Sequence, residues 1–408
     1  MRLPRLSALA AAAALIALPA SAGTIVFNAD TSDPQPRAAF EWVVKTFQAE
    51  NPDIKVTFNV YDHESYKQSI RNWLTSAPPD VVLWYSGTRM RQFSGPGLLA
   101  DVSDLWTDKE KTAFGGSVET VTDNGKQYGV PYSYYQWGIY YRKDIFDTAG
   151  VTKLATWDDL LSACDKLKAA GVEPIDIGSK ELWTTAGWFD YLDLRINGFD
   201  FHKKLTDGKT SWEDPKIKAV FAKWKELLDK QCFVKNHTSL AWQESQSLLY
   251  QGKSAMMLIG NFITQGFPPE VAPKMEFTPF PQIVAGVPDA EEAPMESINI
   301  PAHAKNLPDA KKFLAFMMRA DVQAKINTFE KQIAANHDAP PPDDRFLKAG
   351  QQLLNNAKGV TQFLDRDTSE DLATVAMKGF QEFMVKPNRI DSILANIEKA
   401  RKRIYGPL

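Results

Sequence analysis

Aromatic side chains stand next to polar or charged ones at several points of the sequence. Trp84 and Tyr85 end an apolar run that begins at Val81, and Arg89 follows beyond a Ser-Gly turn. The other groups of this kind are Tyr135-Gln136, Trp183 with Trp188, Trp242-Gln243 and Asn261-Phe262. Aromatic faces cover apolar C–H surface, while amide and charged groups donate and accept hydrogen bonds. The combination is typical of a site for a sugar, although packing in a core explains any single aromatic residue equally well.

Charged residues provide further candidates. Asp365-Arg366-Asp367 interrupts a region that is otherwise aliphatic, and Glu296 directly precedes a strand predicted over residues 297–301. Here the arginine can donate hydrogen bonds and the flanking carboxylates can accept them in a fixed geometry, which suits ligand binding. A surface ion pair, which contributes little by itself, is the alternative explanation of the Asp-Arg-Asp stretch.

Catalytic and metal-binding motifs are missing from the sequence. It has no Gly-x-Ser-x-Gly elbow, no P-loop, no Gly-rich dinucleotide fingerprint and no CxxC or HExxH pattern, and its five histidines are scattered. We therefore predict a protein that is not an enzyme and has no metal site or cofactor. Glycoside hydrolysis stays open, because some of the 50 acidic residues must form pairs and only their separation in space decides.

The first 22 residues have the pattern of a cleaved secretory signal. Arg2 and Arg5 precede an apolar run over residues 6–18, and Pro-Ala-Ser-Ala completes the pattern at residues 19–22. The run is too short for a membrane anchor, the alternative interpretation. Without its two arginines, 45 basic residues remain against 50 acidic ones, a formal charge of −5. This predicts a periplasmic protein with no nucleic-acid partner and no direct membrane insertion.

The chain contains two cysteines, Cys164 and Cys232. An exported protein can join them in a disulfide, and in the chain-entropy model such a long loop would stabilise the fold by about 4 kcal/mol. Two buried free thiols explain the same residues equally well.

Strand and helix patterns alternate along the chain. Strand patterns over residues 24–28, 54–60 and 81–84 alternate with helical patterns near residues 38–47 and 66–74. This order predicts a mostly parallel sheet covered by helices, with ligands at the carboxyl ends of the strands.

A second α/β unit follows the first. Its strands are predicted at residues 137–141, 174–178 and 254–259, with one helix from an N-cap at Thr156 to Ala170 and others near residues 220–228 and 239–250. The strand at 297–301 and a helix over 308–319 then suggest a return to the first unit. A polar, proline-rich connector at residues 338–343 leads to helices at the end of the chain.

These segments, in this order, resemble the extracellular solute-binding proteins (family 1) of carbohydrate ABC importers, the large family that includes maltose-binding protein. The matching stretches are FQAENPDIKVTF, PPDVVLWYSG, GLLADVSDLW, GKQYGVPYSYYQWGIYYRKDIF, TWDDLLSACDKLKAAG, GKSAMMLIGNF and PDAKKFLAFM. AGWFDYLDLRING, AWQESQSLL and FLDRDT are similar to a proteobacterial branch with sugar uptake. The resemblance extends over nearly the whole chain after the signal.

The resemblance implies an α/β, two-lobed clamshell with three crossovers, each lobe a mostly parallel sheet flanked by helices. Lobe 1 would comprise residues 24–131 and 297–336, and lobe 2 residues 132–296 and 345–408. Residues 337–344 would form a hinge connector. A monomer of this kind would capture a sugar between its lobes and deliver it to permease transmembrane subunits with a cytoplasmic ATPase.

The resemblance also assigns residues to the ligand. Trp84 falls where the family has a sugar-stacking tryptophan. Arg89 lies near a polar pair of the family, but Gly87-Thr88 stands where its aspartate would be. Phe262 replaces an indole, and charged residues at 365–367 replace a further aromatic, which predicts a mono- or disaccharide. The full predicted set is Trp84, Tyr85, Arg89, Tyr135, Gln136, Trp183, Trp188, Trp242, Gln243, Asn261, Phe262, Glu296, Arg366 and Asp367. A glycoside hydrolase, or a binding protein for a polyol or other non-sugar solute, is the alternative.

Overall fold

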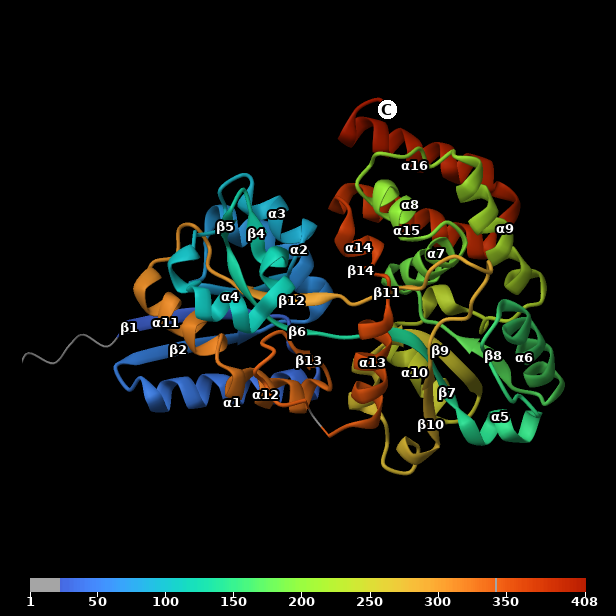
Figure 1. The fold of residues 1–408 in the computed structure, drawn as a ribbon, viewed down its shortest axis with the longest axis horizontal. Helices are drawn as coiled ribbons and strands as arrows, with labels where there is room; N and C mark the ends of the chain where they lie inside the picture. Colours follow the sequence, from blue (N-terminus) through green and yellow to red (C-terminus); the bar gives the residue numbers. More distant parts are fainter. Residues whose placement is uncertain (1–22, 342) are drawn as a thin grey trace, which may run out of the picture.

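The computed structural model describes residues 23–341 and 343–408. It has two lobes, seen on the left and right of Figure 1, joined by segments that cross between them. The predicted signal peptide, residues 1–22, lies outside the described residues. No helix of the described ranges is both long and apolar enough to span a bilayer.

Lobe 1 is built on a six-stranded sheet with the order β13-β6-β12-β3-β1-β2. Its strands are β1 (Gly23–Ala29), β2 (Ile54–Val60), β3 (Val81–Tyr85), β6 (Gly129–Tyr134), β12 (Met295–Asn299) and β13 (Ile333–Ala334), and a hairpin of β4 (Thr122–Asp123) and β5 (Lys126–Gln127) accompanies them. The helices of this lobe are α1 (Pro34–Glu50), α2 (His63–Ser76), α3 (Thr88–Ser94), α4 (Asp108–Phe114), α11 (Leu307–Met317) and α12 (Ala320–Glu330).

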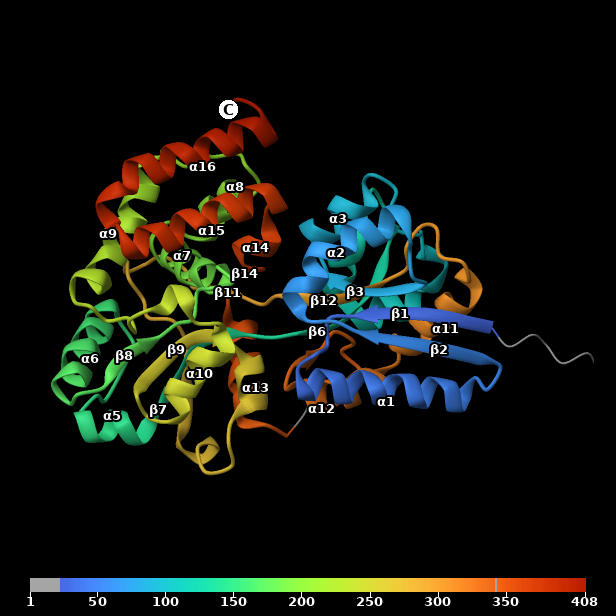
Figure 2. The ribbon, with the colours of Figure 1, turned by 180° about the vertical axis from the view of Figure 1, so that it is seen from behind.

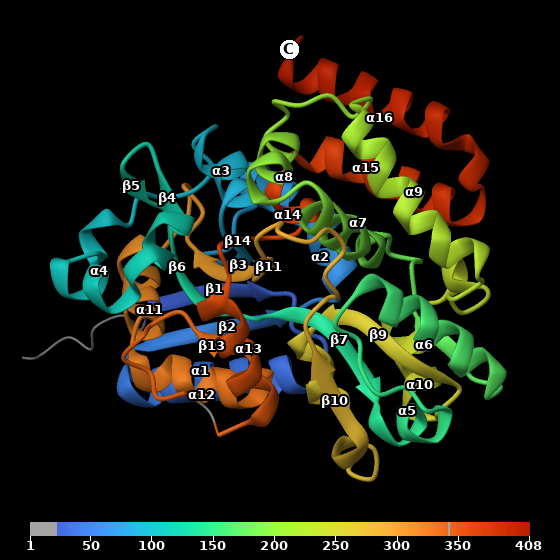
Figure 3. The ribbon, with the colours of Figure 1, turned by 45° about the vertical axis from the view of Figure 1, so that its right-hand side comes forward.

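Lobe 2 has a four-stranded sheet with the order β10-β7-β9-β8. Its strands are β7 (Trp137–Arg142), β8 (Glu173–Asp176), β9 (Ser254–Gly260) and β10 (Met275–Thr278), and β11 (Ala290–Glu292) pairs separately with β14 (Gly359–Thr361). The helices are α5 (Lys143–Ala149), α6 (Trp157–Ala169), α7 (Trp183–Ile196), α8 (Phe199–Thr206), α9 (Pro215–Asp229), α10 (Trp242–Tyr250), α13 (Arg345–Asn356), α14 (Leu364–Asp367), α15 (Glu370–Val385) and α16 (Ile390–Tyr405). Figure 3 shows α15 and α16 together on the outside of this lobe.

The α/β class and the two-lobed arrangement are confirmed, but the sheets are mixed rather than mostly parallel. β1 runs parallel to β2 and β3, as the alternation of strands and helices predicts. β12 enters the same sheet from lobe 2 and runs antiparallel to β3 and β6. In lobe 2, β7 arrives from lobe 1 and runs antiparallel to β9 and β10, and only β8 is parallel to β9. The strands next to a crossover therefore run against their neighbours, which local sequence patterns do not reveal.

The chain passes between the lobes at three places. β6 continues into β7, the segment after β11 enters β12, and the segment after β13 leads to α13. Figure 2 shows these connections from behind. Each lobe has its own hydrophobic core, and the three connections run between the two cores.

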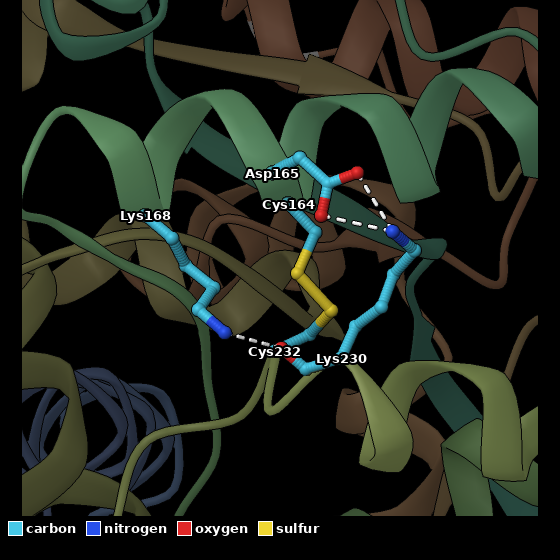
Figure 4. The surroundings of a disulfide bond; sticks show 5 residues. All are labelled: Cys164, Asp165, Lys168, Lys230 and Cys232. Atoms are coloured by element: carbon cyan, nitrogen blue, oxygen red, sulfur yellow. Dashed lines mark hydrogen bonds and ion pairs between the residues drawn. A yellow bond between two sulfur atoms is a disulfide. The ribbon is translucent and has the colours of Figure 1, made fainter.

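Lobe 2 contains the disulfide between Cys164 and Cys232, so the structure decides between the two alternatives for the cysteines. The bond joins α6 to the segment after α9 (Figure 4). Beside it, Lys230 forms an ion pair with Asp165 at 2.7 Å. α6 itself begins as predicted, because Thr156 and Asp159 form a reciprocal capping box at its start.

Candidate functional site

A cavity of about 160 Å³ lies between the lobes, at the carboxyl ends of the strands of lobe 1. Asp30 follows β1, Tyr85 ends β3, and His63 begins α2 after β2; all three reach the cavity because parallel strands end at the same edge of a sheet. Glu296 pairs with Tyr85 across β12 and β3 and joins the same wall. Glu330, the last residue of α12, completes it.

The wall from lobe 1 is organised by hydrogen bonds around His63. Its Nδ1 lies 2.7 Å from Asp30 Oδ2, and its Nε2 lies 3.0 Å from the Tyr85 hydroxyl. Burial opposes the charge of His63, but the hydrogen bond and the charge of Asp30 raise the pKa of His63 above its ordinary value. Burial would raise the pKa of Asp30, but His63 outweighs it and lowers that pKa. Each residue therefore favours the charged form of the other.

The opposite wall, from lobe 2, is aromatic. Its rings come from strand ends, helix starts and the adjoining turns, and they are Tyr135, Trp137, Trp183, Trp242, Phe262 and Phe363. Phe262 lies 5.1 Å from Trp242 and 6.2 Å from Trp183, measured between ring centroids. Trp242 and Phe262 are only half-buried, so this cluster keeps apolar faces open to the cavity.

Arg366, from α14 of lobe 2, connects the two walls. Its Nη1 donates to Glu296 Oε1 at 2.7 Å, and its Nη2 donates to the Tyr135 hydroxyl at 3.2 Å. The guanidinium carbon lies 4.0 Å from the centre of the Tyr85 ring, a cation–π contact. Burial raises the pKa of Glu296, while the charge of Arg366 works in the opposite direction. The arginine thus pairs with a partly buried carboxylate of the other lobe.

Contacts from both lobes hold α14 in position. The backbone N–H of Leu364 donates to Asp190 Oδ2 at 2.6 Å, and Arg89 Nη1 donates to the Asp365 carbonyl at 3.0 Å. Asp365 also pairs with Lys67 of lobe 1 at 3.4 Å. These bonds fix the short helix that carries Arg366. Arg89 contacts this helix but does not line the cavity.

A family model described as bacterial extracellular solute-binding protein matches residues 31–324, well over half of the chain. The chain belongs to this family. An uncharacterized ABC transporter extracellular-binding protein of Pyrococcus horikoshii is 28% identical over 335 residues, covering 79% of this chain and 74% of its own. The multiple sugar-binding protein of Streptococcus mutans is 22% identical over 297 residues, covering 71% and 70%.

Solved structures of bacterial solute-binding proteins share the fold. The solute receptor AcbH, described as having an exclusive substrate preference for β-D-galactopyranose, matches with a TM-score of 0.88 and 28% identity, covering 94% of this chain and 100% of its own. RafE in complex with raffinose matches with a TM-score of 0.77 and 21% identity, covering 93% and 99%. The chain is thus a solute-binding protein of the ABC importer type, and its structural neighbours include sugar receptors.

The cavity of this solute-binding protein includes eight of the residues predicted for the ligand. They are Tyr85, Tyr135, Trp183, Trp242, Gln243, Phe262, Glu296 and Arg366. The structure places six others outside the cavity lining, namely Trp84, Arg89, Gln136, Trp188, Asn261 and Asp367.

Three of these six are explained by packing and by the anchoring of α14. Trp84 packs against Phe93 and donates its indole N–H to the Arg89 carbonyl at 3.3 Å, so its neighbour Tyr85 is the ring that reaches the cavity. Asp367 accepts from Lys203 at 3.2 Å and supports α14.

The other three lie in the body of lobe 2 or beside its crossover. Trp188 packs edge-on against Phe233 and Phe280 in the core. Gln136 donates to Asn261 Oδ1 at 3.0 Å, and Asn261 donates to the Lys331 carbonyl of lobe 1 at 2.5 Å. The Asn261 amide therefore joins the lobes, and the Gln136 amide supports it from within lobe 2.

Sequence reasoning missed several lining residues. Asp30 directly follows β1, and His63 lies three residues after β2 at the start of α2, so the rule that ligands bind at carboxyl ends of parallel strands could have found them. Trp137 and Phe363 were not predicted, because nothing in the sequence distinguishes them from the other aromatic residues. Glu330 had no local signal, because it reaches the cavity only through the packing of α12 beside β13.

A buried acidic pair behind α14 makes the stability depend on pH. Burial raises the pKa of Asp190, and burial with the charge of Asp190 raises the pKa of Glu292 well above its usual value. His202 and Asp193 lie beside this pair, with His202 Nδ1 2.9 Å from Asp193 Oδ2. We expect the folded pair to hold a proton, which would supply the donor that two adjacent carboxylates lack.

The variant Glu292→Gln should be more stable than the wild type at pH 8.5 by about 1–2 kcal/mol, with little difference at pH 5.5. Folding raises these pKa values, so the wild type is most stable below the unfolded value of about 4 and loses stability as the pH rises through the folded value. Glutamine stays neutral and keeps a donor. Urea unfolding at both pH values measures the effect, with Glu213→Gln at an exposed position as the control. Parallel pH profiles for wild type and Glu292→Gln would exclude the shared proton.

Proposed function

We propose that this protein is the periplasmic substrate-binding component of a carbohydrate ABC importer and captures a mono- or disaccharide in the cavity between its lobes. The observation that carries the proposal is that an aromatic wall of the cavity faces a polar wall. Half-buried rings of lobe 2, such as Trp242 and Phe262, face hydrogen-bonding groups of lobe 1, such as Asp30 and Glu296. A sugar needs both, because its C–H faces stack on rings and its hydroxyl groups require paired donors and acceptors.

The size of the cavity supports a small ligand. Its volume of about 160 Å³ is below the range of about 300–1,000 Å³ typical of sites for drug-sized molecules. Arg366 narrows the space between the lobes by contacting Glu296 across it, and Tyr135 contacts Arg366 from its own lobe. A long oligosaccharide would have to displace them.

The proposed mechanism is capture by closure of the lobes and release to a permease. The ligand binds between the walls and favours the arrangement in which both contact it. Permease transmembrane subunits with a cytoplasmic ATPase then accept the loaded protein. The predicted signal sequence supports its location in the periplasm.

Titration of the purified chain from residue 23 onward with a panel of mono- and disaccharides tests the proposal. Sugar binding should change the tryptophan fluorescence, since Trp183 and Trp242 line the cavity, and should raise the melting temperature. Saturation at about 100 times the Kd adds about 2.7 kcal/mol of stability. The recovered sugar should be chemically unchanged in a reducing-end assay. Stabilisation by an amino acid or polyamine, with no response to any sugar, would contradict the proposal, and release of new reducing ends would favour a glycoside hydrolase.

Variants of two neighbouring residues, Tyr85 and Trp84, distinguish an effect on binding from an effect on packing. Tyr85→Ala should weaken sugar binding about tenfold, because it removes the ring under Arg366 and the hydroxyl that contacts His63. Trp84→Phe should lower the free energy of unfolding by about 1–2 kcal/mol through lost packing and a lost hydrogen bond, with the Kd unchanged. Calorimetric titration and urea unfolding measure the two effects. Weaker sugar binding by Trp84→Phe, with an unchanged Kd for Tyr85→Ala, would instead assign Trp84 to the binding site.

A further inference from the structure

The cations that line the cavity are already paired with protein groups. His63 pairs with Asp30 at 2.7 Å, and Arg366 pairs with Glu296 at 2.7 Å. The second amino group of Arg366 donates to Tyr135, and its face lies on Tyr85. No lysine belongs to the lining within residues 23–341 and 343–408. A ligand therefore meets no free positive charge.

Carboxyl groups, in contrast, outnumber these cations. Glu330 lines the same wall, and among the described residues its side chain takes part in no ion pair. Burial, with the charges of Glu296 and Asp30, raises the pKa of Glu330 well above its usual value. An anionic group placed here would be buried beside acids with no counter-charge, and burying an unpaired charge is costly.

Two polar atoms of the lining are available to a neutral ligand. Thr31 Oγ1 and Arg366 Nε are buried and have no hydrogen-bond partner in the described part of the chain. Their residues are 3% and 5% exposed, respectively. A hydroxyl group can accept from the guanidinium N–H and exchange a hydrogen bond with the threonine, so these atoms suit an uncharged polyhydroxylated ligand.

We propose that Glu296 determines the charge class of the ligand: by occupying Arg366 it restricts the cavity to uncharged sugars and excludes sugars that carry a carboxylate or phosphate. This inference rests on the proposed function. It assigns to Glu296 a role in specificity, since the side chain neutralises Arg366, the one arginine of the cavity lining among the described residues. Removing the carboxylate while keeping the shape should release Arg366 for an anionic ligand.

Matched pairs of sugars test the inference. Calorimetric titration of the wild type compares glucose with glucuronate, galactose with galacturonate, and glucose with glucose 6-phosphate. The neutral member that binds should do so at least about 100-fold more tightly than its anionic partner. In Glu296→Gln this ratio should fall at least about tenfold, mainly through tighter binding of the anion. Equal affinities of the wild type for a neutral sugar and its uronate would overturn the inference.

Two further arms distinguish the possible causes. Asp33→Asn removes the same charge from the cavity lining, and the structure shows no contact of Asp33 with Arg366. An equal gain of anion binding in this variant would show that the general field of the cavity sets the selectivity and would overturn the role of Glu296. If Glu296→Gln fails to fold, the wild-type ratio still decides the exclusion of anions. If no member of any pair and no sugar of the mono- and disaccharide panel binds, the proposed function fails, whereas tight binding of both members of a pair leaves that function standing and refutes only the charge selection.

Discussion

Replacing Arg366 with alanine should weaken sugar binding by at least about 100-fold while both lobes remain folded. Arg366 is the side chain that contacts Glu296 and Tyr85 of lobe 1 and Tyr135 of lobe 2. Without it, Glu296 keeps its partly buried position but loses its ion-pair partner, and truncating one member of a desolvated pair costs about 2–5 kcal/mol. The variant also lacks Nε, a buried donor with no partner among the described residues.

Calorimetric titration with the sugar that binds the wild type measures this loss. Arg366→Lys keeps the charge but not the planar fork, so its affinity should lie between those of the wild type and the alanine variant. Arg71→Ala, at an exposed position of α2, is the matched control and should bind normally. The double variant Arg366→Ala/Glu296→Gln should unfold at a higher urea concentration than Arg366→Ala, because it no longer buries an unpaired carboxylate. An Arg366→Ala protein with wild-type affinity would remove Arg366 from the binding site.

The double variant Cys164→Ala/Cys232→Ala should lower the free energy of unfolding by about 4 kcal/mol without changing the affinity for the ligand. The disulfide closes a loop between residues 68 apart in sequence, and a crosslink of this length restricts the unfolded chain strongly. Neither cysteine lines the cavity. The loss should therefore appear in the unfolding of lobe 2 and not in the binding site.

Urea unfolding with and without a reducing agent measures this effect. Reductant should destabilise the wild type by a similar amount and leave the double variant unchanged, which separates the crosslink from the packing of its side chains. Lys230→Ala is a useful control, because it removes the ion pair next to the disulfide and exposed pairs of this kind contribute less than about 1 kcal/mol. A stable, reductant-insensitive wild type would contradict the prediction.

Much of the fold was accessible from local sequence patterns. The capping box at Thr156 marks the start of α6, and the apolar runs mark β3 and β9. The direction of a strand is a property of its partner, however. β12 lies between β3 and β6, and nothing within its five residues shows that it enters the sheet from the other lobe.

The candidate site was predicted less completely, for a related reason. Tyr85 and Trp84 are adjacent rings at one strand end, and only the pairing of β3 with β12 shows that Tyr85 shares the cavity wall with Glu296. The position of Arg366 depends on a hydrogen bond from Leu364 to Asp190, residues 174 apart in the sequence. Such long-range contacts orient a side chain without leaving a signal in its own neighbourhood.

The position of Glu296 one residue after the start of β12 has a mechanical consequence. β12 follows directly on one of the crossing segments, so a ligand that contacts Glu296 acts close to the axis about which the lobes would turn. The end of α16 lies far from this axis (Figure 1). In the proposed closure the ligand acts at a short distance from the axis, and the outer helices move at a long distance from it. A small displacement of the sugar at Glu296 would become a large displacement of the outer helices. Ligand binding would then change the position of a surface that does not contact the ligand.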